Sequence, residues 1–228
     1  MKKLTVFVLL LMLLSCNNDQ QSSGGAAGTT YLRTLYTAFG GGSLTISWIW
    51  LGDDGTIVHN PVHGVNPVRI DTEKKDNADN VGTYKMEGDK MLITWSNNKT
   101  DEWSIDRKDG KISIIDGGIT TVPNEFEKGE TIEGQFAAVA LGGAFSRVQT
   151  MVFKKDGSFA IETSTAVSNE YVSEIGKTGQ RGRYELDGNT LRMQFEDGKE
   201  QVATIAHWKD EDGTITLVIN NSSFPQEK

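Results

Sequence analysis

"GTYKMEGDKMLITW" (residues 82–95) and "GRYELDGNTLRMQF" (residues 182–195) repeat one pattern within a single chain. Glycine, tyrosine and a second glycine stand at the same positions in both, and apolar residues alternate with mostly polar ones. A period of two is typical of antiparallel strands with one buried face, and the centres at 88–89 and 188–189 suit two-residue turns. Each stretch therefore predicts a β-hairpin.

The similarity extends beyond these hairpins. "FGGGSLTISWIWLGDDGTI" (39–57) aligns without a gap on "LGGAFSRVQTMVFKKDGSF" (141–159), and "KDGKISII" (108–115) aligns on "EDGTITLV" (211–218). Short strands separated by Asp-Gly turns are typical of β-meanders and barrels. The sequence therefore predicts an all-β fold of two homologous antiparallel units, residues 31–122 and 131–228, which pack together or complete one larger barrel.

The N-terminus has the features of an export signal. Lys2 and Lys3 precede an apolar run that is too short to span a membrane as a helix, so residues 1–15 are predicted to be a signal peptide. The "LLSC" at 13–16 resembles the lipobox of bacterial lipoproteins, and Cys16 is the chain's single cysteine. The resemblance implies lipidation of Cys16 and an outer-membrane lipoprotein facing the periplasm or the outside. The alternative is a secreted protein with an unmodified cysteine.

The composition limits the partners. Residues 16–30 are small and polar and predict a flexible tether behind the lipid. Without Lys2 and Lys3 the chain keeps 21 basic residues against 31 acidic ones, a formal net charge of −10. This balance argues against nucleic acid as a partner. One cysteine allows no internal disulfide, and no cofactor is predicted.

An Asp-Gly hairpin, a long loop, then Gly-x-Tyr-x-x-x-Gly and an alternating strand occur in both halves. This order resembles the lipocalin-like domains of uncharacterised bacterial lipoproteins. The resemblance covers nearly all of the mature chain and implies β-barrels and ligand binding, without implying an enzyme.

Candidate binding residues are sought where the two copies differ, because shared residues are explained by folding. Trp48 and Trp50 lie on one face of a predicted strand, where the second copy has Thr150 and Val152. An indole pair can bind a sugar or a flat apolar ligand, and the alternative is a larger core in the first unit. Trp103, which aligns with Ala203, shows the same asymmetry.

The longest differences are two predicted connections, 59–80 and 164–180. The first contains His59 and His63, which we include among the candidate ligand-binding residues. Pro61 lies between them, so a regular helix does not place them on one face. A metal site would need further ligands such as Asp71 or His207. We predict no metal site and no catalytic residue.

These features predict a lipid-anchored, non-catalytic binding protein of the cell envelope, whose ligand is a small apolar molecule or a glycan. One alternative is a structural or inhibitory partner of another envelope protein, which an open strand edge could recruit. A second alternative is an envelope hydrolase built on the long loops.

Overall fold

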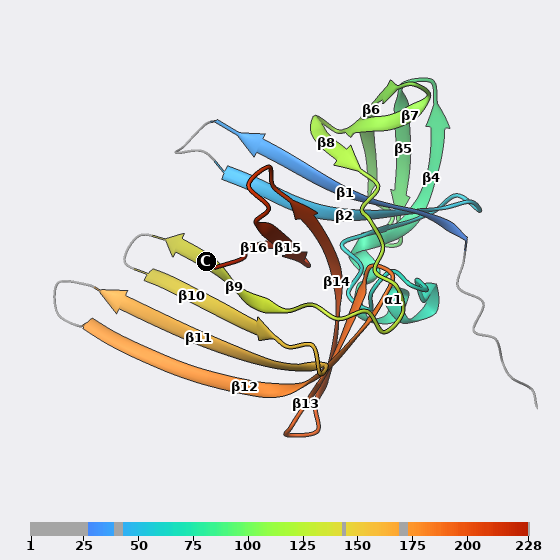
Figure 1. Ribbon diagram of the computed structural model, residues 1–228. Helices are drawn as coiled ribbons and strands as arrows, with labels where there is room; N and C mark the ends of the chain where they lie inside the picture. The colour runs from blue at the N-terminus through green and yellow to red at the C-terminus, as the bar shows by residue number, and fades with distance from the viewer. Residues whose placement is uncertain (1–26, 39–42, 143–144, 169–172, 228) are drawn as a thin grey trace, which may run out of the picture.

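The computed structural model describes residues 27–38, 43–142, 145–168 and 173–227. The predicted signal peptide, Cys16 and most of the predicted tether lie outside the described residues. Sixteen strands, one short α-helix and one 3-10 turn follow one another along the described chain (Figure 1). The all-β prediction is confirmed.

The first repeat is a closed barrel of eight antiparallel strands. The strands are β1 (Gly28–Thr37), β2 (Ser43–Gly52), β3 (Thr56–His59), β4 (Val81–Glu87), β5 (Lys90–Trp95), β6 (Thr100–Lys108), β7 (Lys111–Ile115) and β8 (Gly118–Thr121). Each strand pairs with its neighbour in the sequence, and β1 closes the barrel by pairing with β8. Strand β1 begins at Gly28, so the last three residues of the predicted tether belong to the barrel.

The second repeat is also an eight-stranded antiparallel sheet in sequential order. The strands are β9 (Gly134–Gly142), β10 (Phe145–Phe153), β11 (Ser158–Ser168), β12 (Ser173–Asp187), β13 (Thr190–Phe195), β14 (Glu200–Lys209), β15 (Ile215–Ile219) and β16 (Ser222–Pro225). A single bridge between Phe136 and Gln226, with a bond from the Glu227 N–H to the Gln135 carbonyl (2.8 Å), brings the edges together. The sheet is therefore nearly closed, and the two repeats do not complete one larger barrel.

The repeated hairpin has a physical explanation in both copies. A Cβ on Gly82 would lie 2.5 Å from the Thr94 carbonyl oxygen, and a Cβ on Gly182 would clash with the Gln194 carbonyl in the same way. Strands β4–β5 and β12–β13 can approach this closely only with glycine at these positions. The adjacent tyrosines belong to the cores of their own repeats.

The repeats are joined through an apolar cluster on the outside of the first barrel. Leu32, Ile46 and Trp48 of β1 and β2 pack against Ala206 and Val218 of β14 and β15, and β14 passes beside β2 in Figure 1. The Trp48 indole N–H also donates to the carbonyl of Asn220 (2.6 Å). A hydrophobic contact with a directional bond at its centre fixes one repeat against the other.

The two long connections differ in structure. Residues 60–80 contain helix α1 (Ile70–Asp76) and the 3-10 turn η1 (Ala78–Asn80), which lie against the first barrel (Figure 1). The prediction of a second loop over 164–180 is wrong for its described part, because residues 164–168 continue β11 and residues 173–180 belong to β12, and the two strands pair residue by residue up to Ser168 and Ser173.

Candidate functional site

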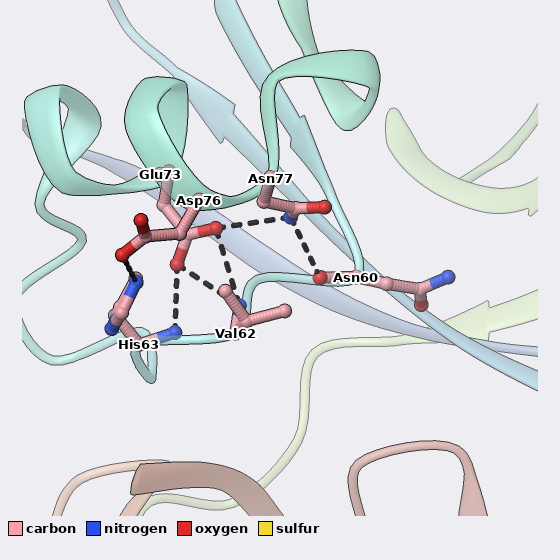
Figure 2. A network of polar contacts seen from close by, with 6 residues as sticks. All are labelled: Asn60, Val62, His63, Glu73, Asp76 and Asn77. Atoms are coloured by element: carbon pink, nitrogen blue, oxygen red, sulfur yellow. Dashed lines mark hydrogen bonds and ion pairs between the residues drawn. The ribbon is translucent and has the colours of Figure 1, made fainter.

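The connection between β3 and β4 is organised around the buried carboxylate of Glu73, on α1 (Figure 2). It accepts hydrogen bonds from the backbone N–H groups of Val62 (2.9 Å) and His63 (2.8 Å), and from the Asn77 amide (3.0 Å). Asn77 also donates to the carbonyl of Asn60 (3.1 Å). Both carboxylate oxygens of Glu73 accept hydrogen bonds that hold the connection in its conformation, so Glu73 is a structural residue.

His63 belongs to the same connection and lies outside the barrel. Its Nε2 is 3.0 Å from the carboxylate of Asp76, as Figure 2 shows. His59 instead points into the barrel, since it shares the inner face of β3 with Ile57. The structure therefore does not bring the two predicted histidines together.

The connection also reaches the second repeat. The hydroxyl of Thr190, at the start of β13, accepts the backbone N–H groups of Val65 and Asn66, both at 2.9 Å. The Asn66 amide is 3.4 Å from the Asp187 carboxylate. The segment 59–80, unmatched in the second copy, thus connects the two repeats.

Trp48 and Trp50 point out of the barrel and are covered. Trp48 has no exposed surface because the second repeat covers it, and Trp50 is 3 % exposed. Trp50 packs with Val65 and Val68 of the connection and lines a cleft of about 340 Å³ between the repeats. Packing accounts for both indoles in this structure, and a ligand-binding role for them stays a prediction.

Inside the first barrel, His59 and Trp103 do come together. Their ring centroids lie 5.6 Å apart in an edge-to-face arrangement, and Trp95 is 5.9 Å from Trp103. The Trp95 indole N–H donates to the carboxylate of Asp101 (2.6 Å). This cluster lies at the end of the barrel that carries the 60–80 connection and the turns at 96–99 and 116–117, here called the loop end.

The environment of His59 favours the neutral imidazole. Burial lowers the pKa of His59 below its ordinary value, and the nearby charge of Arg33 lowers it further. A hydrogen bond with Asn80 and the charge of Asp101 oppose this shift. The Nε2 atom of His59 is buried and has no partner among the described residues.

The opposite end of the barrel, here called the turn end, carries the turns at 53–55, 88–89 and 109–110. It contains a recess of about 630 Å³, a volume within the usual range of small-molecule sites. Its lining residues are Tyr31, Arg107, Gly110, Lys111, Ile112, Thr121 and Val122.

The recess combines apolar walls with two positive charges. Tyr31 and Ile112 reach it from the first barrel's core, and Val122 is largely exposed at its rim. Burial raises the pKa of the Tyr31 hydroxyl, and the charge of Arg107, which lines the same recess, opposes that shift. Arg107 is held by a bond to the Gly88 carbonyl (3.1 Å). An anionic group is therefore favoured at the rim.

The positive charges are specific to the first repeat. The turn "RKDGK" (107–111) aligns with "DEDGT" (210–214) in the second, so both copies keep the Asp-Gly turn while Arg107 and Lys108 give way to acids and Lys111 gives way to the neutral Thr214. Folding does not require a basic turn here. This loss of positive charge is a sequence signal for Arg107 and Lys111 that long connections and tryptophans do not reveal.

Among the described residues, no group of three or more His, Cys, Asp or Glu side chains is arranged to hold a metal ion. No helix in the described part of the chain has the length and apolar character needed to cross a membrane. Comparison with protein-family models, with curated proteins and with solved structures found no match to this chain.

Proposed function

We propose that this protein is a lipid-anchored, non-catalytic binding protein of the cell envelope with two lipocalin-like repeats. The turn-end recess of the first barrel would bind a small apolar molecule that carries an anionic group. The recess itself supports the proposal, because it joins the apolar side chains of Tyr31 and Ile112 to the charges of Arg107 and Lys111. An apolar wall with few polar groups suits a fatty acid-like ligand better than a neutral sugar.

The attachment to the envelope rests on the sequence of residues 1–30. Lipidation of Cys16 would leave residues 17–27 as a tether before β1 begins at Gly28. Tyr31 follows three residues later, so the tether enters the barrel at the end that holds the recess. A Cys16→Ala variant is expected to appear in the soluble or uncleaved fraction. Membrane retention of a processed Cys16→Ala protein would contradict the proposed anchor.

The ligand class is tested by calorimetric titration of decanoate and decanol into the folded chain (residues 16–228), made without acylation. We expect decanoate to bind more tightly than decanol. Lys111→Gln should weaken decanoate binding about fivefold, the effect of losing one partly screened charge pair. Lys108→Gln is the matched control, because Lys108 lies in the same exposed hairpin without lining the recess.

Equal affinity for decanoate in wild type and Lys111→Gln would contradict the proposal. Equal affinity for decanoate and decanol would also contradict the anionic group. A change in Lys108→Gln as large as in Lys111→Gln would show a general charge effect rather than binding in the recess.

The nearly closed second sheet supports a second candidate function, strand pairing with another envelope protein. Within the described residues, the part of β9 beyond Phe136 pairs with β10 on one side only. Val139, in this part, is 61 % exposed. An open edge can add a strand from a partner.

A photo-crosslinker at Val139 should then give one defined adduct in cells. The control is a photo-crosslinker at the exposed Glu102 of β6, which should give no adduct. The same adduct pattern at both positions would argue against strand pairing.

A further inference from the structure

Buried polar atoms without partners concentrate inside the first barrel. Among the described residues, four buried side-chain polar atoms have no hydrogen-bond partner within the protein, and they belong to Ser47, His59, Thr120 and His207. The first three lie in the first repeat. Most buried polar groups in proteins are paired, so three unpaired groups in one barrel require an explanation.

The strand register makes these three residues neighbours around one arginine. Arg33 is directly opposite Ser47 on β2 and opposite Thr120 on β8. Ile49 of β2 is directly opposite His59 of β3, and Ser47 lies two residues before Ile49 on the same strand. Ser47 and His59 therefore both face the barrel interior. Opposite residues on one face of antiparallel strands have Cβ atoms about 5 Å apart. The row Thr120, Arg33 and Ser47 therefore forms one continuous polar strip on the barrel wall.

Arg33 carries a buried positive charge. Its side chain is 10 % exposed. Nε donates to the Ile115 carbonyl (2.8 Å), and Nη2 donates to the Asp116 carbonyl (2.7 Å) and lies 3.4 Å from the Asp116 carboxylate. Among the described residues, these contacts involve Nε and Nη2 and leave Nη1 without a recorded bond. The Asp116 carboxylate is about half exposed, so it neutralises the buried guanidinium only weakly.

The second repeat shows that the fold does not need this polar strip. The pairing register places Ala138 opposite Gln149, as Arg33 is opposite Ser47, and Ile161 opposite Met151, as His59 is opposite Ile49. Ala138 and Ile161 both contact the apolar core of the second repeat. The same architecture is thus built with apolar residues where the first barrel has a cation and an imidazole.

We infer that the strip formed by Arg33, Ser47 and Thr120 at the loop end binds a small carboxylate. Two hydroxyls and a guanidinium supply donors, and a carboxylate has lone pairs for about four of them. The rings of Trp95 and Trp103 beside His59 would cover a flat apolar body attached to the carboxylate. This site is separate from the turn-end recess and does not depend on it.

The experiment titrates benzoate, with uncharged benzamide as its isostere, into the folded chain (residues 16–228) at constant ionic strength. Tryptophan fluorescence reports binding because Trp95 and Trp103 lie beside the site. We expect benzoate to change the emission and benzamide to have little effect. Ser47→Ala and Thr120→Val should each weaken benzoate binding about five- to tenfold.

The same variants separate binding from folding. Because the two hydroxyls have no partner among the described residues, their removal should leave the urea midpoint unchanged or raise it. Thr34→Val is the matched control, since Thr34 neighbours Arg33 in sequence but lies on the outer face opposite exposed Ile119. It should bind benzoate like the wild type.

Several results would overturn the inference. Equal responses to benzoate and benzamide would exclude a carboxylate site, as would displacement of benzoate by chloride at the same concentration. If Thr120→Val and Ser47→Ala both bound benzoate with wild-type affinity, the polar strip would not be a binding site. A lower urea midpoint in both variants, with unchanged binding, would show that the hydroxyls serve folding alone.

Discussion

Glu73 is a fully buried carboxylate whose oxygen atoms accept only N–H donors in Figure 2. Glu73→Gln would turn one acceptor into an amide that faces these donors. We expect this change to lower the free energy of unfolding by about 2 kcal/mol, the usual cost of an unsatisfied buried group. Urea unfolding measures it. Asp71→Asn on the exposed side of α1 is the control and should change stability by less than about 0.5 kcal/mol. A loss as small as this in Glu73→Gln would show that α1 tolerates an amide at 73.

His59 gives the first barrel a defined pH dependence. Because burial and Arg33 lower the pKa of His59 in the folded protein, the unfolded chain binds this proton more tightly. The His59 contribution to stability is therefore fully present above about pH 6.5 and is lost as the pH falls, by at most about 1.4 kcal/mol per pH unit. NMR titration of the folded protein should give a midpoint below 6.5 for His59. A midpoint at or above 6.5 would contradict the burial argument.

Single residues also show where sequence reasoning ends. His59 and Trp103 were found because they have no counterpart in the second copy, and the structure brings them together. Arg33, Ser47 and Thr120 gave no signal, since a polar residue in an alternating strand is expected on the solvent face. Only the barrel register shows that these three side chains point inward.

At the scale of elements, the two repeated hairpins use the same tyrosine differently. The Tyr184 hydroxyl accepts the Ile132 N–H (2.8 Å) and donates to the Ile132 carbonyl (2.9 Å). Within the described part of the chain, the Tyr84 hydroxyl has one recorded bond, to the Gly52 carbonyl (3.1 Å), and Tyr84 is less buried than Tyr184. We expect Tyr184→Phe to cost about 2 kcal/mol and Tyr84→Phe about 1 kcal/mol or less, measured by urea unfolding. Equal losses would mean that the second contact adds nothing.

The strands and tight turns were largely predictable because alternation and Asp-Gly turns are local signals. The extension of β11 to Ser168 and the start of β12 at Ser173 were not, since the polar sequence over 164–180 resembles a loop when the partner strand is unknown. The role of segment 59–80 was hidden for a related reason. Its bonds to Thr190 join residues more than a hundred positions apart, and no local pattern encodes them.

At the scale of the whole molecule, we expect Trp48 to determine whether the two repeats unfold as one unit. Trp48→Ala removes a fully buried indole from the contact with Ala206 and Val218 and also removes the bond to Asn220. A large-to-small change at such a site costs about 3–5 kcal/mol. Trp48 stabilises the interface between the repeats rather than the interior of either barrel. We therefore expect Trp48→Ala to let the two repeats unfold separately. Calorimetry should show one transition in the wild type and two in the variant.

Trp103→Ala is the matched control for this experiment, because it deletes an indole inside the first barrel, away from the second repeat. It should lower the transition temperature while Trp48 still couples the repeats. If Trp48→Ala unfolds in one transition and Trp103→Ala in two, the contact between the repeats would not be the coupling element. The difference between the copies would then have to be explained by other features of the first barrel, such as the buried Arg33 and His59, whose register positions hold Ala138 and Ile161 in the second repeat.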